Sequence, residues 1–186
     1  AITDPDSANM VSATIVLTNA KTGDVLSVGT LPAGISSSVD TSVSGQITVT
    51  LTGSATKANY ETALKAVTFS STNSNPDTTT RTVTVKVNDG TSDSATATTS
   101  ITFSAVDNAP SVDLDANNSS TATGNNYLTS YTEGGAAAAI ADTDVAITDP
   151  DSANMVSATI VLTNAKTGDV LSVGTLPAGI SSSVDT

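Results

Sequence analysis

The chain has 186 residues, no cysteine, a formal net charge of −12 and 38% hydrophobic residues, but only 3% aromatic ones. Its six Lys and Arg residues argue against nucleic acid or an anionic membrane surface as a partner, because binding to phosphates needs basic side chains. A disulfide scaffold is excluded, and no apolar run approaches the roughly 20 residues of a membrane helix.

The first part of the chain carries a series of segments that predict short strands. In residues 11–18, Val11, Ala13 and Ile15 alternate with Ser and Thr, which is typical of a half-buried strand. Further strands are expected over 24–28, 47–52, 82–87 and 99–103. Asn, Asp, Ser and Gly supply the turns between them. Many short strands separated by turns predict an all-β fold, a β-sandwich.

One segment, near residues 57–66, has a helical rather than an alternating pattern. Tyr60, Leu64 and Val67 fall at i, i+4 and i+7, and Thr56 precedes them as a possible N-cap. We interpret it as the only helix longer than two turns, a short helix that closes one end of the sandwich. A helix that binds a partner is the alternative.

Self-similarity defines the organisation of the chain. Residues 1–41 recur without change as residues 146–186, so the period is 146 − 1 = 145 residues. The turn-forming residues Asp107 and Asn108, followed by Pro110, predict a boundary between repeats at this point. Residues 1–107 are then the later part of one repeat, and residues 108–186 are the first part of the next. After the boundary, further strands are expected over 112–114, 127–132 and 137–147.

These boundaries leave each part of the chain without strands that the other could supply. One possibility is that neighbouring chains complete each other head to tail in a filament, and another is that the segment belongs to a continuous array. A third possibility is that residues 108–145 fold back onto residues 1–107 as a permuted domain. We favour the filament or the array. In all three cases we expect the two identical copies to adopt the same local fold.

The residues that most catalytic sites need are missing. Without His or Cys, the chain has no Ser-His or Cys-His nucleophile. A zinc site is not expected either, because zinc sites normally use His or Cys as ligands. Two carboxylates would suffice for a glycosidase, but such sites normally have aromatic walls, and the chain has three Tyr and two Phe. The sequence therefore predicts that the protein is not an enzyme.

The carboxylates are the remaining chemistry, with sixteen Asp and two Glu residues. Ca²⁺ takes six to eight oxygen ligands from carboxylates, Asn and carbonyl groups, and a DxD pair on a strand presents two carboxylates on one face. The alternative is that these residues serve only in turns and in solubility. The candidate calcium ligands are Asp4, Asp6, Asp89, Asp107, Asn108, Asp113, Asp115, Glu133, Asp149 and Asp151.

Several stretches of the sequence resemble a known family. Val106-Asp107-Asn108-Ala109-Pro110 is similar to the DxNDNAP linker of cadherins, although the DRE motif of true cadherins is missing. The stretches YTEGGAAAAIADTDVAITDPDSANMVSATIVLTN, LTGSATKANYETALKAVTFSS and RTVTVKVNDGTSDSATATTSITF resemble the cadherin-like repeats of giant bacterial surface proteins, including RTX-type adhesins. The similarity covers nearly the whole period.

This resemblance implies an Ig-like or cadherin-like sandwich, calcium at the domain junctions and a place at the extracellular cell surface. By position, Glu133 resembles the acid near the start of a cadherin domain, and Asp107 and Asn108 resemble linker ligands. The two DPD motifs, Asp4-Pro5-Asp6 and Asp149-Pro150-Asp151, resemble a DxD calcium motif. The expected function is that of a structural spacer or adhesive stalk whose partners are neighbouring identical repeats or chains. The alternative is an adhesive module that binds a glycan or a protein ligand.

Overall fold

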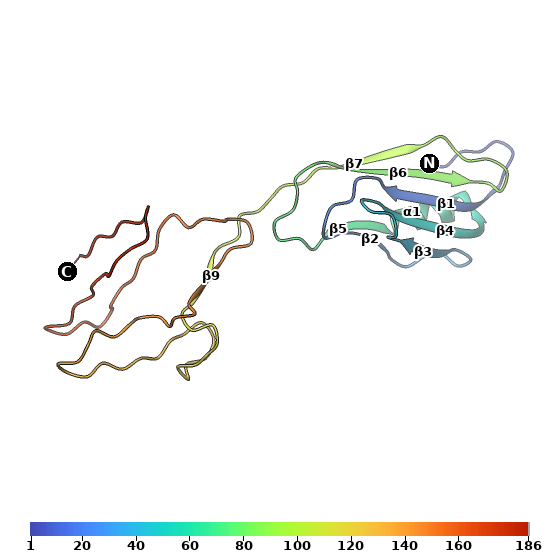
Figure 1. Cartoon of the computed structure of the whole chain (residues 1–186). Helices are drawn as coiled ribbons and strands as arrows, with labels where there is room; N and C mark the ends of the chain where they lie inside the picture. Colours follow the sequence, from blue (N-terminus) through green and yellow to red (C-terminus); the bar gives the residue numbers. More distant parts are fainter. Residues whose placement is uncertain (186) are drawn as a thin grey trace. The chain divides into compact units, whose positions relative to one another are not determined.

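The computed structural model describes residues 1–185, which form two compact units, one ending at Asp151 and one beginning at Ser152 (Figure 1). Nine strands and one helix are present in this part of the chain. In order, these are β1 (Asn9–Leu17), β2 (Asp24–Val28), β3 (Ser36–Asp40), β4 (Ile47–Thr56), α1 (Lys57–Lys65), β5 (Val67–Ser71), β6 (Arg81–Asn88), β7 (Ala97–Ile101), β8 (Ser111–Asp113) and β9 (Ala146–Thr148).

The largest sheet is antiparallel and has the order β3-β4-β1-β6-β7. Strand β1 lies in its centre, where Ile15 is opposite Val49 of β4 on one side and Val85 of β6 on the other. The alternation expected from the sequence therefore buries one face of β1, with Ala13, Ile15 and Leu17, while both edges of the strand pair with neighbours. Strands β3 and β7 form the edges, and nearly all of their residues are exposed.

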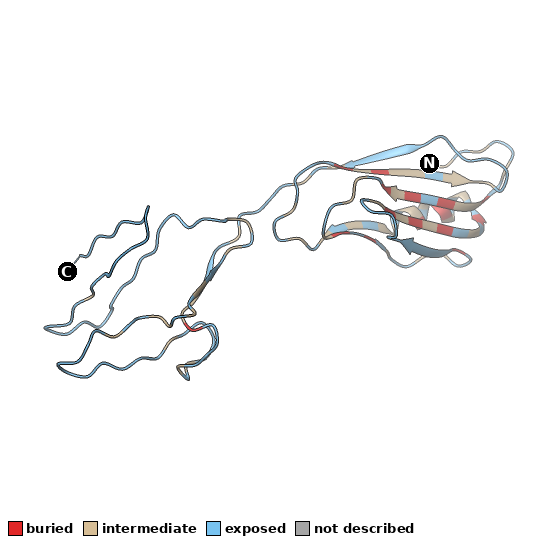
Figure 2. Ribbon diagram, in the orientation of Figure 1, coloured by how far each residue is buried: buried red, intermediate tan, exposed pale blue. Residues whose placement is uncertain are grey.

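A second, two-stranded sheet of β2 and β5 completes a sandwich-like arrangement. Leu26 of β2 is buried in the same core as Leu17, Val49 and Leu51 of the large sheet. Figure 2 shows that the buried residues concentrate in the region of β1, β4 and α1. The predicted all-β, sandwich-like fold is confirmed.

The short helix is also confirmed, and α1 is the only helix among residues 1–185. The Thr56 side chain caps it by accepting a hydrogen bond from the backbone N–H of Asn59 at 3.3 Å. Tyr60 is fully buried, and its hydroxyl donates to the carbonyl oxygen of Gly53 at 2.7 Å. Gly53 has a φ of +131°, and an added Cβ would lie 1.9 Å from the carbonyl oxygen of Gly34. Only glycine fits there.

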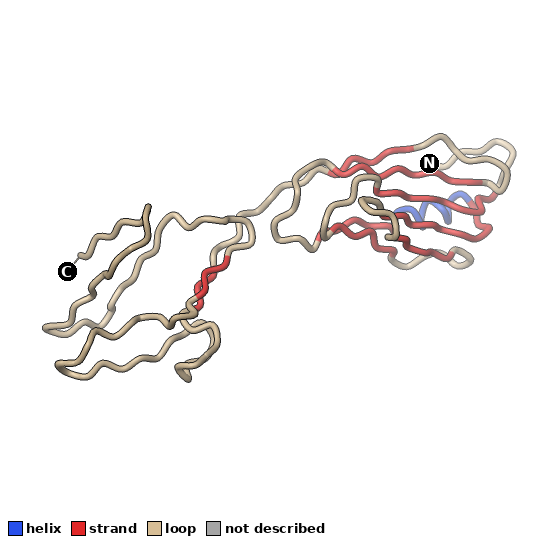
Figure 3. The backbone as a smooth tube through the Cα atoms, in the orientation of Figure 1, coloured by secondary structure: helices blue, strands red, loops and turns tan. Residues whose placement is uncertain are grey.

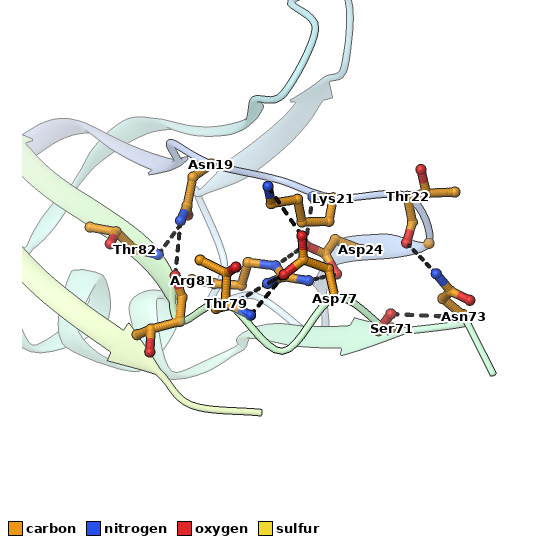
Figure 4. Close-up of polar contacts among 12 residues, drawn as sticks. Asn19, Lys21, Thr22, Asp24, Ser71, Asn73, Asp77, Thr79, Arg81 and Thr82 are labelled. Atoms are coloured by element: carbon orange, nitrogen blue, oxygen red, sulfur yellow. Dashed lines mark hydrogen bonds and ion pairs between the residues drawn. The ribbon is translucent and has the colours of Figure 1, made fainter. Parts of the chain in front are cut away.

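A buried ion pair joins the two sheets (Figure 4). Arg81, at the start of β6, is fully buried, and its Nε donates to Asp24 Oδ2 at 2.5 Å. The guanidinium group also donates to the carbonyl oxygen of Thr79, and it lies 4.4 Å from the centre of the Phe103 ring. Because Arg81 and Asp24 are both buried, this contact fixes β2 against β6.

Some strands differ from those expected. Strand β3 (Ser36–Asp40) was not predicted, because its Ser-rich sequence on an exposed edge has no apolar alternation. Strand β5 (Val67–Ser71) was not predicted either, because its first residue also continues the helical spacing of α1. Strand β7 begins and ends two residues earlier than expected, and Phe103 instead packs edge-to-face on Phe69 at 5.6 Å.

Two expected strands in the later part of the chain are wrong. Residues 127–132 contain no strand, and only the last two residues of the expected strand over 137–147 belong to one, β9 (Ala146–Thr148). The strand expected over 112–114 is observed as Ser111–Asp113, which pairs with β9 alone. Residues 108–145 thus form no sheet with residues 42–107, so the permuted domain is not observed. The boundary at residues 107 and 108 stays a prediction.

The expectation that the two identical copies share one local fold is also wrong for their strands. Residues 9–17 form β1, whereas the identical residues 154–162 form no strand, as Figure 3 shows for the chain after β9. Conversely, residues 146–148 form β9 with β8, while the identical residues 1–3 form no strand. A strand needs a hydrogen-bonded neighbour, and each copy has different neighbours available.

The turns, in contrast, are the same in both copies. The backbone N–H of Asp24 donates to the carbonyl of Lys21 at 3.0 Å, and that of Asp169 donates to the carbonyl of Lys166 at 3.0 Å. The glycines at the centre of these turns, Gly23 and Gly168, have φ values of +87° and +95°. Structure determined by near neighbours in the sequence therefore recurs, and structure that needs distant strands does not.

Candidate metal centre

Three aspartates from two loops that are far apart in the sequence form one acidic cluster. Asp4 and Asp6 belong to the segment before β1, and Asp89 belongs to the turn after β6. One carboxylate oxygen from each lies within 4.8 Å of the others. We call these three residues the DPD cluster. They line a shallow pocket together with Thr91 and Ser92.

Backbone and hydroxyl groups orient these carboxylates. The N–H of Ser7 donates to Asp4 Oδ1 at 2.9 Å, and the Ser7 hydroxyl donates to Asp89 Oδ2 at 2.8 Å. The N–H groups of Thr91 and Ser92 donate to Asp89 Oδ1 at 2.8 and 2.7 Å. Both loops therefore hold their acids in defined positions, which is the arrangement that a multidentate oxygen site needs.

The start of α1 fixes the loop that carries Asp4. The ammonium group of Lys57 donates to the carbonyl oxygens of Asp4 and Ser7 at 2.7 and 2.9 Å. The carboxylate of Glu61 accepts from the N–H of Ile2 at 2.7 Å. The sequence did not single out Lys57 as part of a site, although its place at the start of the predicted helix was visible. The helix thus positions the loop of the candidate centre as well as contributing Tyr60 and Ala63 to the core.

Among the described residues, no cationic side chain forms an ion pair with the DPD cluster. The ion pairs found among residues 1–185 involve Asp24, Asp77 and Asp93. Lys57 reaches backbone carbonyls and not carboxylates. Three acids at this separation repel one another when all are ionised, so the cluster favours a bound cation or a retained proton.

The pKa values follow this geometry. The backbone N–H of Ser7 is the main cause that lowers the pKa of Asp4. The pKa of Asp6 is raised by its hydrogen bond to Asp4 and by the charge on Asp4. In the second copy, the pKa of Asp151 is instead lowered, mainly because the backbone N–H of Asn108 donates to it. Asp6 and Asp151 are the same residue of the repeat, with opposite shifts.

We therefore expect Asp6 to titrate above, and Asp151 below, the ordinary value of 3.8 in carbon-detected NMR of the carboxyl groups without added divalent cations. The contribution of Asp151 to stability is present above its unfolded pKa and is lost as the pH falls through its folded pKa. The contribution of Asp6 to stability has the opposite pH dependence. It is present below the unfolded pKa and is lost as the pH rises through the folded pKa. Equal titration midpoints for the two residues would contradict the geometry.

A second acidic group follows β8. Carboxylate oxygens of Asp115, Asp142 and Asp144 lie within 4.8 Å of one another, and we call these residues the Asp115 cluster. Asp115 is fully buried and accepts hydrogen bonds from the N–H groups of Ser119 and Ser120 at 3.0 and 2.8 Å. These donors stabilise an ionised carboxylate in a buried position.

The Asp115 cluster also contains an unsatisfied oxygen. Asp144 Oδ2 accepts from the N–H of Asn117 at 2.9 Å, but Asp144 Oδ1 is buried without a hydrogen-bond partner. The Ser120 hydroxyl is the main cause that lowers the pKa of Asp115, and the Ser119 hydroxyl is the main cause that lowers that of Asp142. A buried acceptor oxygen beside ionised carboxylates suits a hard cation.

The structure brings some of the predicted ligands together and leaves others apart. Asp4, Asp6 and Asp89 meet in one cluster, and Asp115 belongs to the other. Six predicted ligands belong to neither cluster: Asp107, Asn108, Asp113, Glu133, Asp149 and Asp151. Sequence reasoning missed Asp142 and Asp144, although Asp142-Thr143-Asp144 is itself a DxD motif.

Two of the remaining candidates interact with each other. The backbone N–H of Asn108 donates to Asp151 Oδ2 at 2.8 Å, and its side-chain amide donates to the same oxygen at 3.0 Å. The side-chain amide also reaches the carbonyl of Ser74 at 2.9 Å. Asp149 and Asp151 correspond to Asp4 and Asp6, but among the described residues they belong to no cluster of three acids.

Comparisons of this chain with family models, with curated proteins and with solved structures found no match. Among residues 1–185, no helix is both long and apolar enough to span a membrane.

Proposed function

We propose that the protein is a non-catalytic structural repeat of an extracellular surface adhesin or filament, stiffened by calcium. The observation that carries the proposal is the exact recurrence of 41 residues after 145 positions. A spacer repeats its surface unchanged, whereas a ligand-binding module is usually unique within its chain. The sandwich of the first unit offers a compact building block of the kind that such arrays repeat.

The two acidic clusters support the calcium part of the proposal. The DPD cluster joins the segment before β1 to the turn after β6, which are far apart in the sequence. A cation bound there would link both loops and remove the repulsion between Asp4, Asp6 and Asp89. Since the unfolded chain has no such arrangement of oxygens, calcium would stabilise the folded state selectively.

We expect calcium to raise the melting temperature of the full chain, measured by circular dichroism with saturating calcium or with a chelator. A cation at 100 times its dissociation constant adds about 2.7 kcal/mol. In a domain of this size, that corresponds to a rise on the order of 10 °C. Magnesium should act more weakly, because it demands a regular octahedral site. Equal melting temperatures in calcium and in chelator would refute a structural role for the cation.

The repeat supplies a matched control for this experiment. The variant Asp4→Asn with Asp6→Asn should lose most of the calcium response of the sandwich, because two of three carboxylates are gone. The same change at Asp149 and Asp151 alters an identical sequence that lies in no cluster of three acids among the described residues, so the melting response should remain. If both double variants respond to calcium alike, the DPD cluster is not the site.

A further inference from the structure

Asn108 joins three segments of the first unit through its donor groups. It belongs to residues 102–110, between β7 and β8, which we call the linker. Its side-chain amide donates to the carbonyl oxygen of Ser74 at 2.9 Å and to Asp151 Oδ2 at 3.0 Å. Its backbone N–H donates to the same Asp151 oxygen at 2.8 Å. Ser74 lies between β5 and β6 of the sandwich, and Asp151 follows β9. One linker residue thus contacts both the sandwich and the end of the β8–β9 pair.

The pairing of β8 with β9 explains why Asn108 meets Asp151. Ser111 is opposite Thr148 in this antiparallel pair. Asn108 comes three residues before Ser111, and Asp151 comes three residues after Thr148, so the two are opposite each other in the same register. Pro110 precedes Ser111 and has no N–H to donate, which ends the backbone ladder there. The Asp151 carboxylate therefore accepts the N–H of Asn108 in place of a backbone carbonyl.

The surroundings of the Asn108 amide group determine which of its ends faces these partners. Three acceptor oxygens surround its nitrogen, namely those of Ser74 and Asp151 and, at 3.3 Å, the carbonyl oxygen of Val106. An amide oxygen turned to this place would meet only other acceptors. The end of the group that points at Asp151 is therefore the donor, and a donor nitrogen does not coordinate a cation.

The acceptor in this contact is a carboxylate that is stabilised in its ionised form. The backbone N–H of Asn108 is the main cause that lowers the pKa of Asp151. Hydrogen bonds to a charged acceptor are about twice as strong as those between neutral groups. Asn108 and Asp151 are both half-buried, so water competes less for these bonds than at an exposed surface. The contact therefore needs no metal ion to balance it.

We propose that Asn108 is a hydrogen-bond clamp that fixes the linker to the sandwich and to Asp151 without a cation. This role differs from that of a calcium ligand, which the sequence predicted for Asn108. The inference rests on the proposed spacer function for its purpose, which is stiffness, but not on calcium. It adds a source of stiffness that lies outside the DPD cluster.

Distances between two spin labels measure whether the clamp holds the linker. The chain has no cysteine, so Thr98→Cys on β7 and Ile147→Cys on β9 give one labelling site on each side of the linker. Both side chains are exposed. Pulsed electron paramagnetic resonance of the full chain then gives the distribution of distances, in chelator and in saturating calcium. We expect one narrow distribution in both conditions.

Three substitutions should broaden this distribution in chelator. Asn108→Ala removes the bond to Ser74 and one of the two bonds to Asp151, so the linker gains the freedom of an unanchored chain. Asn108→Asp keeps the size of the side chain but places a second carboxylate against Asp151, and the two repel each other. A residue that only fills space would tolerate this change. Asp151→Ala removes the shared acceptor and should act in the same direction.

The chain offers a matched control for each site. Asn75→Ala removes an exposed amide from the loop that carries Ser74, and Asp6→Ala changes the residue of the first copy that is identical to Asp151. Neither should broaden the distribution. Circular dichroism verifies that each variant keeps the sandwich folded, which we expect because Asn108 and Asp151 lie outside its strands and its core.

Two results would overturn the inference. The first is a broad distribution of the unchanged chain in chelator that narrows in calcium, because the linker would then depend on a cation. The second is a distribution for Asn108→Ala that is as narrow as that for Asn75→Ala. Either result, with a melting temperature that calcium raises, would leave the proposed calcium stiffening intact. A clamp that behaves as expected, with no effect of calcium on the melting temperature, would remove the calcium stiffening and retain the clamp.

Discussion

We expect the substitution Arg81→Ala to destabilise the first unit by about 3–5 kcal/mol, because it removes one member of a buried ion pair. Arg81 and Asp24 are both buried, and the Nε–Oδ2 distance is 2.5 Å. Without the guanidinium group, the carboxylate of Asp24 stays in the interior without a counter-charge. The loss of the contact between Arg81 and the Phe103 ring adds to the effect. Urea unfolding followed by circular dichroism measures the change.

The repeat again provides an internal comparison. Asp24→Asn should be strongly destabilising, whereas Asp169→Asn should change stability by no more than about 0.5 kcal/mol. Asp169 makes the same turn with Lys166 but is exposed, and no arginine lies beside it in the described residues. A cost for Arg81→Ala no larger than that of Lys86→Ala, a change at the surface, would show that the ion pair is not structural.

The sequence was sufficient to predict those elements whose apolar residues recur with the spacing of a strand or of a helix. Val11, Ala13 and Ile15 alternate and form β1, and Thr56 with Tyr60 marks the helix correctly. Strand β3 escaped prediction because an exposed edge strand places no demand on apolar side chains. Arg81 was not singled out by the sequence, since its burial depends on Asp24, which is 57 positions away.

The candidate metal centre could likewise be predicted only in part, because the sequence shows its separate motifs but not that they meet. The DPD motif and the turn around Asp89 were each visible in the sequence, but their meeting depends on the pairing of β1 with β6. Asp142 and Asp144 carried a local signal that was not used. Glu133 and Asp107 were candidates both as acidic residues and by resemblance, and neither lies in a cluster of three acids among the described residues.

The two copies separate local from non-local causes within one molecule. Identical residues form identical turns at Gly23 and Gly168, because a turn is closed by neighbours in the sequence. The same residues form a central strand in one copy and none in the other, because β1 depends on β4 and β6. Strand propensity alone therefore does not decide the state of residues 154–162.

This difference predicts a large contrast between two substitutions that are the same in sequence context. Leu17 is fully buried between Ile47 of β4 and Val83 of β6, so Leu17→Ala should cost about 2–5 kcal/mol through lost burial and a residual cavity.

Leu162→Ala removes the same methyl groups from a side chain that is 40% exposed and has no strand neighbours, so its cost should stay within about 0.5 kcal/mol. Urea unfolding of the two full-length variants, at a protein concentration low enough to keep the chain monomeric, compares them directly. Equal costs would mean that residues 146–186 are packed in solution as residues 1–41 are.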